Sequence, residues 1–172
     1  MKKLLLILAG LTLLASACSS KKSGTTLDNI PKYKGYVNDF ENIFTDAEEK
    51  TLDSLITAFE KETSVEIAVV TLDTTMVGPT SDDMYAITFE IANTWGVGKK
   101  EKDSGVLIGI SKSRRLLRIQ NGLGTEKVMS DMQTKEIVDH YFIPNFKEGR
   151  YFTGTYEGLK QIMNHLRPYY KQ

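Results

Sequence analysis

The segment "GVLIGISKSRRLLRIQNGLGTEKVMSD", Gly105 to Asp131, contains the stretch that decides the fold. Its first six residues, Gly105–Ile110, are apolar at both alternating positions, which predicts a strand with both faces covered. The sequence "KSRR" at 112–115 favours a turn into "LLRIQ" at 116–120, which is expected to be the second strand of a hairpin. A strand covered on both faces requires other elements on either side of the sheet.

Amphipathic helices surround this hairpin in the sequence. Residues 44–63, "FTDAEEKTLDSLITAFEKET", form the clearest one, with Thr45 or Asp46 as its cap and one apolar face. A β-branched strand follows at 65–72, and then a second helix at 81–95, with one side formed by Tyr85, Phe89, Ala92 and Trp95.

After the hairpin, residues 127–142 are predicted to be helical with a break, and Pro144 is expected to end that helix. A last helix is expected at 153–166, with inward residues Tyr156, Leu159, Ile162, Met163 and Leu166. The order of helices and buried strands predicts an α/β fold. We expect a single-domain three-layer α/β/α sandwich with a mixed central sheet.

The N-terminus has the features of an export leader. Lys2 and Lys3 precede an apolar run at 4–14, which is too short to span a bilayer comfortably, and "ASAC" follows at 15–18. Small residues before the chain's only cysteine resemble the lipobox of a bacterial lipoprotein. This predicts a lipoprotein signal peptide at 1–17, lipidation of Cys18, a tether at 18–34 and one domain at 35–172. The alternative is an ordinary A-x-A cleavage site and a secreted protein with a free N-terminal thiol.

Composition excludes several classes of function. The formal net charge is 0, and the leader removes two lysines and no acids, so nothing in the charge favours nucleic acid. After Cys18 there is no further cysteine, which excludes disulfides and thiolate zinc sites. No later segment is apolar for long enough to form a membrane helix.

The glycine-rich segments do not match phosphate-binding motifs. "GLGTEK" at 122–127 has the wrong spacing for a Walker loop, and Lys127 replaces the third glycine of a dinucleotide fingerprint. "WGVGKK" at 95–100 follows a helix and precedes a strand, the inverse of the required order. We therefore do not expect a nucleotide site.

The same glycine turn is better suited to displaying acids. Gly122 and Gly124 permit positive φ or close backbone approach, and Glu126 and Asp131 follow them. Asp103 immediately precedes the buried strand. Because the start of one hairpin strand lies beside the end of the other, we expect Asp103 and residues 122–131 at the same edge of the sheet.

Five motifs together resemble the TPM-domain family. They are "YVND" at 36–39, "VEIAVVTL" at 65–72, "WGVGKKEKDSGVLIGIS" at 95–111, "RRLLRIQNGLGTEKVMSD" at 114–131 and "FKEGRYFTGTYEGL" at 146–159. The resemblance implies an α/β/α sandwich with an acidic, calcium-type metal site at one end of the sheet. It also implies export and membrane attachment, and some members are described as acid phosphatases.

Carried over residue by residue, the resemblance implies four metal ligands: Asp39, Asp103, Glu126 and Asp131. This chain departs from the family pattern at Ser104, where asparagine is commoner. It also departs in having no C-terminal membrane helix, which is consistent with a lipid anchor at Cys18.

Oxygen ligands without a cysteine or a histidine pair suit Ca²⁺ or Mg²⁺. Ca²⁺ takes roughly six to eight oxygens, so backbone carbonyls (Gly122 and Gly124 are candidates) and water would complete the shell. The alternative is that these acids cap helices and solvate loops.

Residues of other catalytic and binding sites are sparse. His140 and His165 lie on predicted helices without a paired ligand, and we expect them to be structural or solvent-facing. The "KSRR" turn, with Lys112, Arg114 and Arg115, is either a solvated hairpin turn or a contact for anionic headgroups or a phosphate.

Three hypotheses follow for the function. The first is a lipid-anchored, divalent-cation-binding scaffold or assembly factor in the bacterial cell envelope, outside the cytoplasm, with an envelope protein as partner. The second is a weak metal-assisted acid phosphatase. The third is a structural lipoprotein without a metal.

Overall fold

A computed structural model describes residues 30–98 and 103–170. The predicted signal peptide at 1–17, Cys18 and most of the predicted tether at 18–34 lie outside these residues. In the described part of the chain, no helix combines the length and the apolarity needed to cross a bilayer.

The centre of the fold is a four-stranded mixed sheet with the strand order β1-β2-β3-β4. Strand β1 (Val37–Asp39) pairs in parallel with β2 (Glu66–Thr71), which pairs in parallel with β3 (Gly105–Ser111). Strand β4 (Leu116–Asn121) returns antiparallel to β3 and completes the predicted hairpin. The start of β3 and the end of β4 therefore lie at one edge of the sheet, whereas β1 and β2 end at the other.

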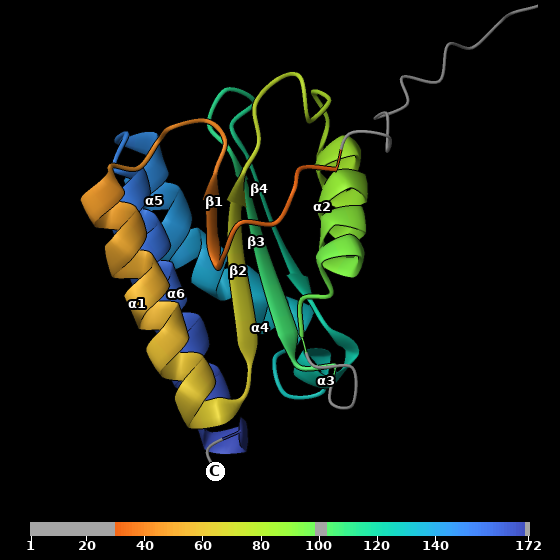
Figure 1. Cartoon of the computed structure of the whole chain (residues 1–172), viewed down its shortest axis with the longest axis vertical. Coiled ribbons are helices and arrows are strands. Elements are labelled where there is room, and N and C mark those ends of the chain that lie inside the picture. Colours follow the sequence, from red (N-terminus) through yellow and green to blue (C-terminus); the bar gives the residue numbers. More distant parts are fainter. Residues whose placement is uncertain (1–29, 99–102, 171–172) are drawn as a thin grey trace, which may run out of the picture.

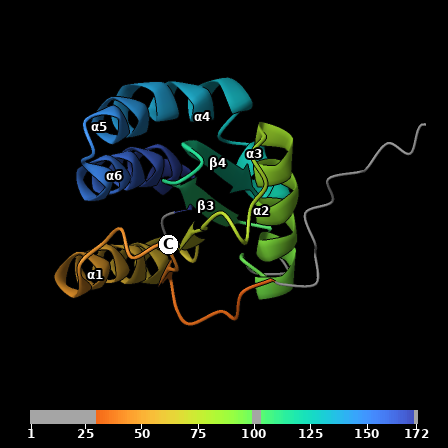
Figure 2. The same ribbon diagram turned by 90° about the horizontal axis from the view of Figure 1, so that it is seen from above.

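Helices cover both faces of the sheet, which confirms the predicted three-layer sandwich (Figures 1 and 2). Helix α2 (Ser81–Trp95) lies on one face, and α1 (Asp46–Thr63) and α6 (Tyr151–Tyr170) lie on the other. The segment between the hairpin and α6 contains α3 (Leu123–Glu126), α4 (Asp131–Ile137), the π-helix η2 (Val138–Phe142) and α5 (Ile143–Lys147).

Every residue of β3 is buried, as its continuous apolar pattern predicted. The strand divides the core in two, because Val106, Ile108 and Ile110 join the cluster with α1 and α6, whereas Leu107 joins the cluster with α2. Gly109 allows α2 to approach, because a Cβ there would lie 2.3 Å from Cγ2 of Thr88.

The first helix begins as predicted. The Thr45 side chain accepts a hydrogen bond from the backbone N–H of Glu48, and the Glu48 carboxylate accepts one from the backbone N–H of Thr45. This reciprocal capping box satisfies two amides that the helix cannot bond internally.

The fully buried stripe of α2 differs from the side formed by Tyr85, Phe89, Ala92 and Trp95. Its buried residues are Met84, Ile87, Thr88 and Ile91. Tyr85 and Phe89 remain 45% and 46% exposed and stack with ring centroids 6.0 Å apart. The β-branched and unbranched aliphatic side chains interdigitate with the sheet, and the aromatic pair is left at the margin.

The prediction that Pro144 ends a helix is wrong. The helix predicted to begin at residue 127 begins at Asp131, and Pro144 lies in the first turn of α5, which continues to Lys147. Proline is tolerated there because the first amides of a helix have no partner within it.

Candidate functional site

The loop before β3 and the loop after β4 are joined by backbone hydrogen bonds. The N–H of Gly122 donates to the carbonyl of Gly105 at 2.8 Å, and the N–H of Gly124 donates to the carbonyl of Asp103 at 3.0 Å. Asp103 adopts a left-handed conformation (φ 46°), which aspartate tolerates better than most residues. The hairpin thus brings Asp103 beside the 122–131 segment, as its pairing predicted.

Gly122 is required for this close approach. A Cβ at this position would lie 2.3 Å from the carbonyl oxygen of Asp103 and 3.2 Å from the backbone nitrogen of Gly105. Both neighbours are backbone atoms, which have no rotamer that could relieve the overlap. The first glycine of "NGLG" therefore serves contact between the two loops, and its φ of −69° is an ordinary one.

Three of the four predicted carboxylates line one pocket at this edge. Asp103, Glu126 and Asp131 line a cavity of about 560 Å³. It lies between α2, the start of β3, the end of β4 and α3. Arg118 of β4 also lines it, and its guanidinium lies 4.7 Å from the centre of the Tyr85 ring. Among the described lining residues, acids thus outnumber cations by three to one.

The three carboxylates are exposed and available to a ligand. In residues 30–98 and 103–170, no hydrogen bond or ion pair engages the side chain of Asp103, Glu126 or Asp131. Nor do any three acidic, histidine or cysteine side chains of this part of the chain converge closely enough to hold a metal ion as they stand. A cation shared by these acids therefore requires their side chains to rotate inward from the rim of the pocket.

Two oxygens beside these acids were not predicted from the sequence. Within the described residues, Oγ of Ser104 and Oδ1 of Asn121 are buried without a hydrogen-bond partner. Asn121 lines the same pocket as the acids, and its amide nitrogen donates to Oγ1 of Thr134 at 3.0 Å. Neutral oxygens of this kind complement carboxylates around a hard cation, so the donor chemistry at this edge fits Ca²⁺ or Mg²⁺.

Asp39 does not belong to this group. It ends β1 beside Thr71, which ends β2, and both lie at the opposite edge of the sheet from Asp103. Its carboxylate accepts hydrogen bonds from the Phe44 N–H at 2.8 Å and from the Thr71 hydroxyl. The structure therefore does not bring Asp39 together with the other three predicted ligands, because strands that run parallel place the end of β1 and the start of β3 at opposite edges.

The histidines take structural or exposed positions. A ring nitrogen of His165 is 2.8 Å from the carbonyl oxygen of Val128, which ties α6 to the segment after α3. His140 is exposed on η2. These positions agree with the sequence prediction for both residues.

Comparison with known proteins assigns a family. Residues 37–165 match the family model of the TPM domain. The chain belongs to the TPM-domain family. No curated protein matches it.

Solved structures share the fold. The N-terminal domain of a protein from P. gingivalis is 28% identical, with a TM-score of 0.67, over 77% of this chain and 82% of that one. The BA42 protein of Bizionia argentinensis is 24% identical, with a TM-score of 0.65, over 77% and 87%. The N-terminal domain of a Corynebacterium glutamicum protein is 12% identical, with a TM-score of 0.58, over 80% and 83%. The last two likenesses concern the fold alone.

Proposed function

We propose that this TPM domain is a non-catalytic scaffold or assembly factor of the bacterial cell envelope, which binds Ca²⁺ or Mg²⁺ through Asp103, Glu126 and Asp131. The observation that carries the proposal is that these three carboxylates come from the loop before β3 and the segment after β4, line one pocket and have no partner in the described part of the chain. Like charges around one pocket repel, and a divalent cation relieves that repulsion. The oxygen-only donor set favours a hard cation over zinc.

Membrane attachment is part of the same proposal. Cys18 follows a short apolar leader, and lipid on its sulfur would hold the domain at a membrane through the 18–34 tether. Cells fed a fatty-acid probe should label the wild-type chain and not Cys18→Ser. If the Cys18→Ser variant retains the label, the lipid is not attached at Cys18, and the proposed anchor is wrong.

Calorimetric titration tests the cation site. The probes are CaCl₂ and MgCl₂, and the protein is the chain from Ser19 onward. That chain retains both core clusters, and the similar P. gingivalis domain was solved alone in solution. We expect heat from the wild type, and affinity about tenfold lower or worse in Asp103→Asn and Asp131→Asn, because ligand charge sets the affinity of such sites.

Asp82→Asn is the matched control, because Asp82 is an exposed acid in the first turn of α2 and does not line the pocket. It should bind as the wild type does. Absence of heat from the wild type, or equal heat from all four proteins, contradicts the metal site and favours the structural lipoprotein.

A metal-assisted phosphomonoesterase is the second candidate, and the position of Arg118 favours it. The guanidinium lines the same pocket as the three acids, where it could neutralise a phosphoryl oxygen beside a bound cation. An assay with p-nitrophenyl phosphate and Mg²⁺ separates the two functions. A scaffold gives no turnover, whereas an enzyme gives turnover that Arg118→Gln and Asp103→Asn both reduce.

A further inference from the structure

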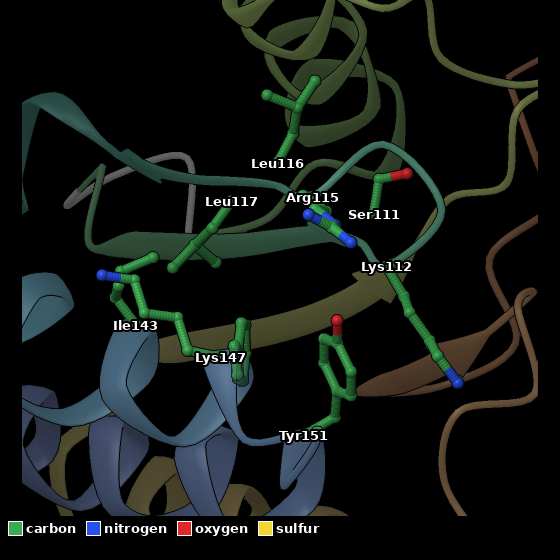
Figure 3. A pocket seen from close by; sticks show the side chains of 10 residues that line it. Ser111, Lys112, Arg115, Leu116, Leu117, Ile143, Lys147 and Tyr151 are labelled. Atoms are coloured by element: carbon green, nitrogen blue, oxygen red, sulfur yellow. The ribbon is translucent and has the colours of Figure 1, made fainter.

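A second cleft lies at the opposite end of the sheet from the carboxylate pocket. It has a volume of about 510 Å³ and is bounded by the β3–β4 hairpin on one side and by α5 and the start of α6 on the other (Figure 3). Its described lining includes three cationic side chains and no acidic one: Lys112, Arg115 and Lys147. This cleft plays no part in the function proposed above.

The remaining wall of the cleft is largely apolar. Leu116 and Leu117 come from the start of β4, and Ile143 and Phe146 come from α5. Figure 3 shows Leu117 and Ile143 facing the space between the strand and the helix. A ligand that fits both parts of this surface carries an anionic group and a hydrocarbon group.

The charge of Arg115 is available in the cleft. In the described part of the chain, its guanidinium makes no hydrogen bond and no ion pair, and the same holds for the amine of Lys147. The neighbouring Arg114 differs, because its guanidinium donates to the carbonyls of Val77 at 3.3 Å and Thr74 at 3.2 Å. Arg114 thus holds the hairpin against the loop at 74–77, whereas Arg115 remains available to a ligand.

The backbone at Arg115 is strained. Its φ is 56°, a left-handed conformation that glycine adopts readily and a long side chain does not. Figure 3 shows that the Arg115 side chain occupies the middle of the cleft, with the Tyr151 hydroxyl directed toward it.

Tyr151 supplies a neutral donor. Burial raises the pKa of its phenol, the charge of Glu41 raises it further, and Arg115 opposes them in part. The hydroxyl therefore keeps its proton at neutral pH. Lys112 lies over the same ring, with its amine 5.6 Å from the ring centre.

The nearby carboxylate of Glu41 is occupied by the hairpin. It accepts hydrogen bonds from the N–H of Lys112 at 2.6 Å, from the N–H of Ser113 at 3.0 Å and from the Ser113 hydroxyl at 2.6 Å. These bonds hold the turn that contains Arg115. They also occupy the carboxylate of Glu41, which would otherwise compete with a ligand for the cationic side chains of the cleft.

We propose that this cleft binds an anionic amphiphile, with its phosphate group held by Arg115, Lys147 and Tyr151 and its hydrocarbon part against Leu117, Ile143 and Phe146. The step is binding alone, and no bond of the ligand is broken. Two sources carry this chemistry: the headgroup of an anionic membrane lipid and a soluble phosphorylated amphiphile.

The test uses three probes on the chain from Ser19 onward. They are decyl phosphate below its micellar concentration, inorganic phosphate, and vesicles of phosphatidylcholine with and without phosphatidylglycerol. Decyl phosphate should bind at least about tenfold more tightly than inorganic phosphate, because a buried alkyl chain adds a favourable contribution for each methylene. Binding to the anionic vesicles assigns the lipid source, whereas decyl phosphate binding without vesicle binding assigns the soluble one.

Variants locate the site. Arg115→Gln should weaken decyl phosphate binding about tenfold, because it removes a charge-assisted hydrogen bond. Arg115→Gly should lose the same affinity while its thermal midpoint is unchanged or higher, which separates binding from folding. Lys50→Gln/Lys61→Gln removes two exposed charges of α1 outside the cleft and should bind as the wild type does.

Three outcomes overturn the proposal. The first is equal affinity of the wild type and Arg115→Gln for decyl phosphate. The second is an equal loss in Lys50→Gln/Lys61→Gln, which would indicate charge alone. The third is binding of inorganic phosphate as tight as that of decyl phosphate, which would remove any role of the apolar wall.

Discussion

The two ends of the central sheet use carboxylates in opposite ways. At the start of β3, backbone hydrogen bonds join the two loops, and the side chains of Asp103, Glu126 and Asp131 have no partner in the described part of the chain. At the end of β3, Asp39 and Glu41 accept hydrogen bonds that hold two loops in place.

The consequence is a difference in what each end offers to a ligand. Where backbone atoms carry the loop contacts, acids remain exposed around the pocket. Where acids carry the loop contacts, the cations Lys112, Arg115 and Lys147 remain around the cleft. The two surfaces are separated by the length of β3, roughly 20 Å. An acidic side chain of this fold is thus a candidate ligand only if it does not already accept hydrogen bonds from the backbone.

Gly122→Ala should give the largest effect on stability, because it disrupts the backbone contact between the two loops at the acidic end of the sheet. The new Cβ would lie 2.3 Å from the carbonyl oxygen of Asp103, and the two loops must separate. We expect a loss of about 3 kcal/mol in the free energy of unfolding, the upper range for overpacking. Urea unfolding measures it.

The control for this variant is the next residue along the chain. Leu123 is 67% exposed, so Leu123→Ala should leave the unfolding midpoint nearly unchanged. A Gly122→Ala protein as stable as the wild type would show that the loops do not meet as described.

Asp39→Ala should give the next largest effect, at the other end. It leaves the N–H of Phe44, a buried residue, and the hydroxyl of Thr71 without their acceptor. The expected loss is about 2 kcal/mol of unfolding free energy, since each buried donor left unsatisfied costs about 1–3 kcal/mol. Calorimetric heat with Ca²⁺ or Mg²⁺ should stay at the wild-type value, and loss of that heat in a folded Asp39→Ala protein would return Asp39 to the metal site.

Most of the fold follows from periodicity in the sequence. The apolar run at 105–110 required covering layers on both faces, and the amphipathic stretch at 44–63 supplied one of them. The buried stripe of α2 does not follow from its sequence alone, because apolar residues lie on more than one side of that helix and packing against β3 selects among them. Pro144 was read as a stop, although a proline in a first turn also permits a new helix.

The candidate site was predicted in part. The hairpin placed Asp103 beside Glu126 and Asp131, because strand pairing is a local property of the sequence. All four acids were expected as ligands from the family resemblance, but no strand pairing predicted from the sequence placed Asp39 beside the other three. Asp39 ends a strand, whereas Asp103 precedes one, and in a parallel arrangement such positions lie at opposite edges. The unpaired oxygen of Asn121 depends on side-chain packing, which the sequence pattern does not encode.

The smallest expected effect is a change in the pKa of Glu49, and it tests whether the charge of Asp39 lies at the end of the sheet away from Asp103. Burial raises the pKa of Glu49 above its usual 4.5, the charges of Asp39 and Asp46 raise it further, and Lys34 opposes them. Between pH 4.5 and the raised value the native state holds more protons than the unfolded state. Stability therefore falls as pH rises through that window.

Replacing Asp39 by Asn should lower the pKa of Glu49, because one of the repelling charges is removed. Asp103→Asn should leave that pKa unchanged, since Asp103 lies at the far end of the sheet and salt screens charges beyond about 10 Å. Carboxyl chemical shifts followed by NMR against pH measure both variants. A Glu49 titration that responds to Asp103→Asn or to added Ca²⁺ would mean that the two ends are coupled, and the separation of acidic and basic surfaces would no longer describe this molecule.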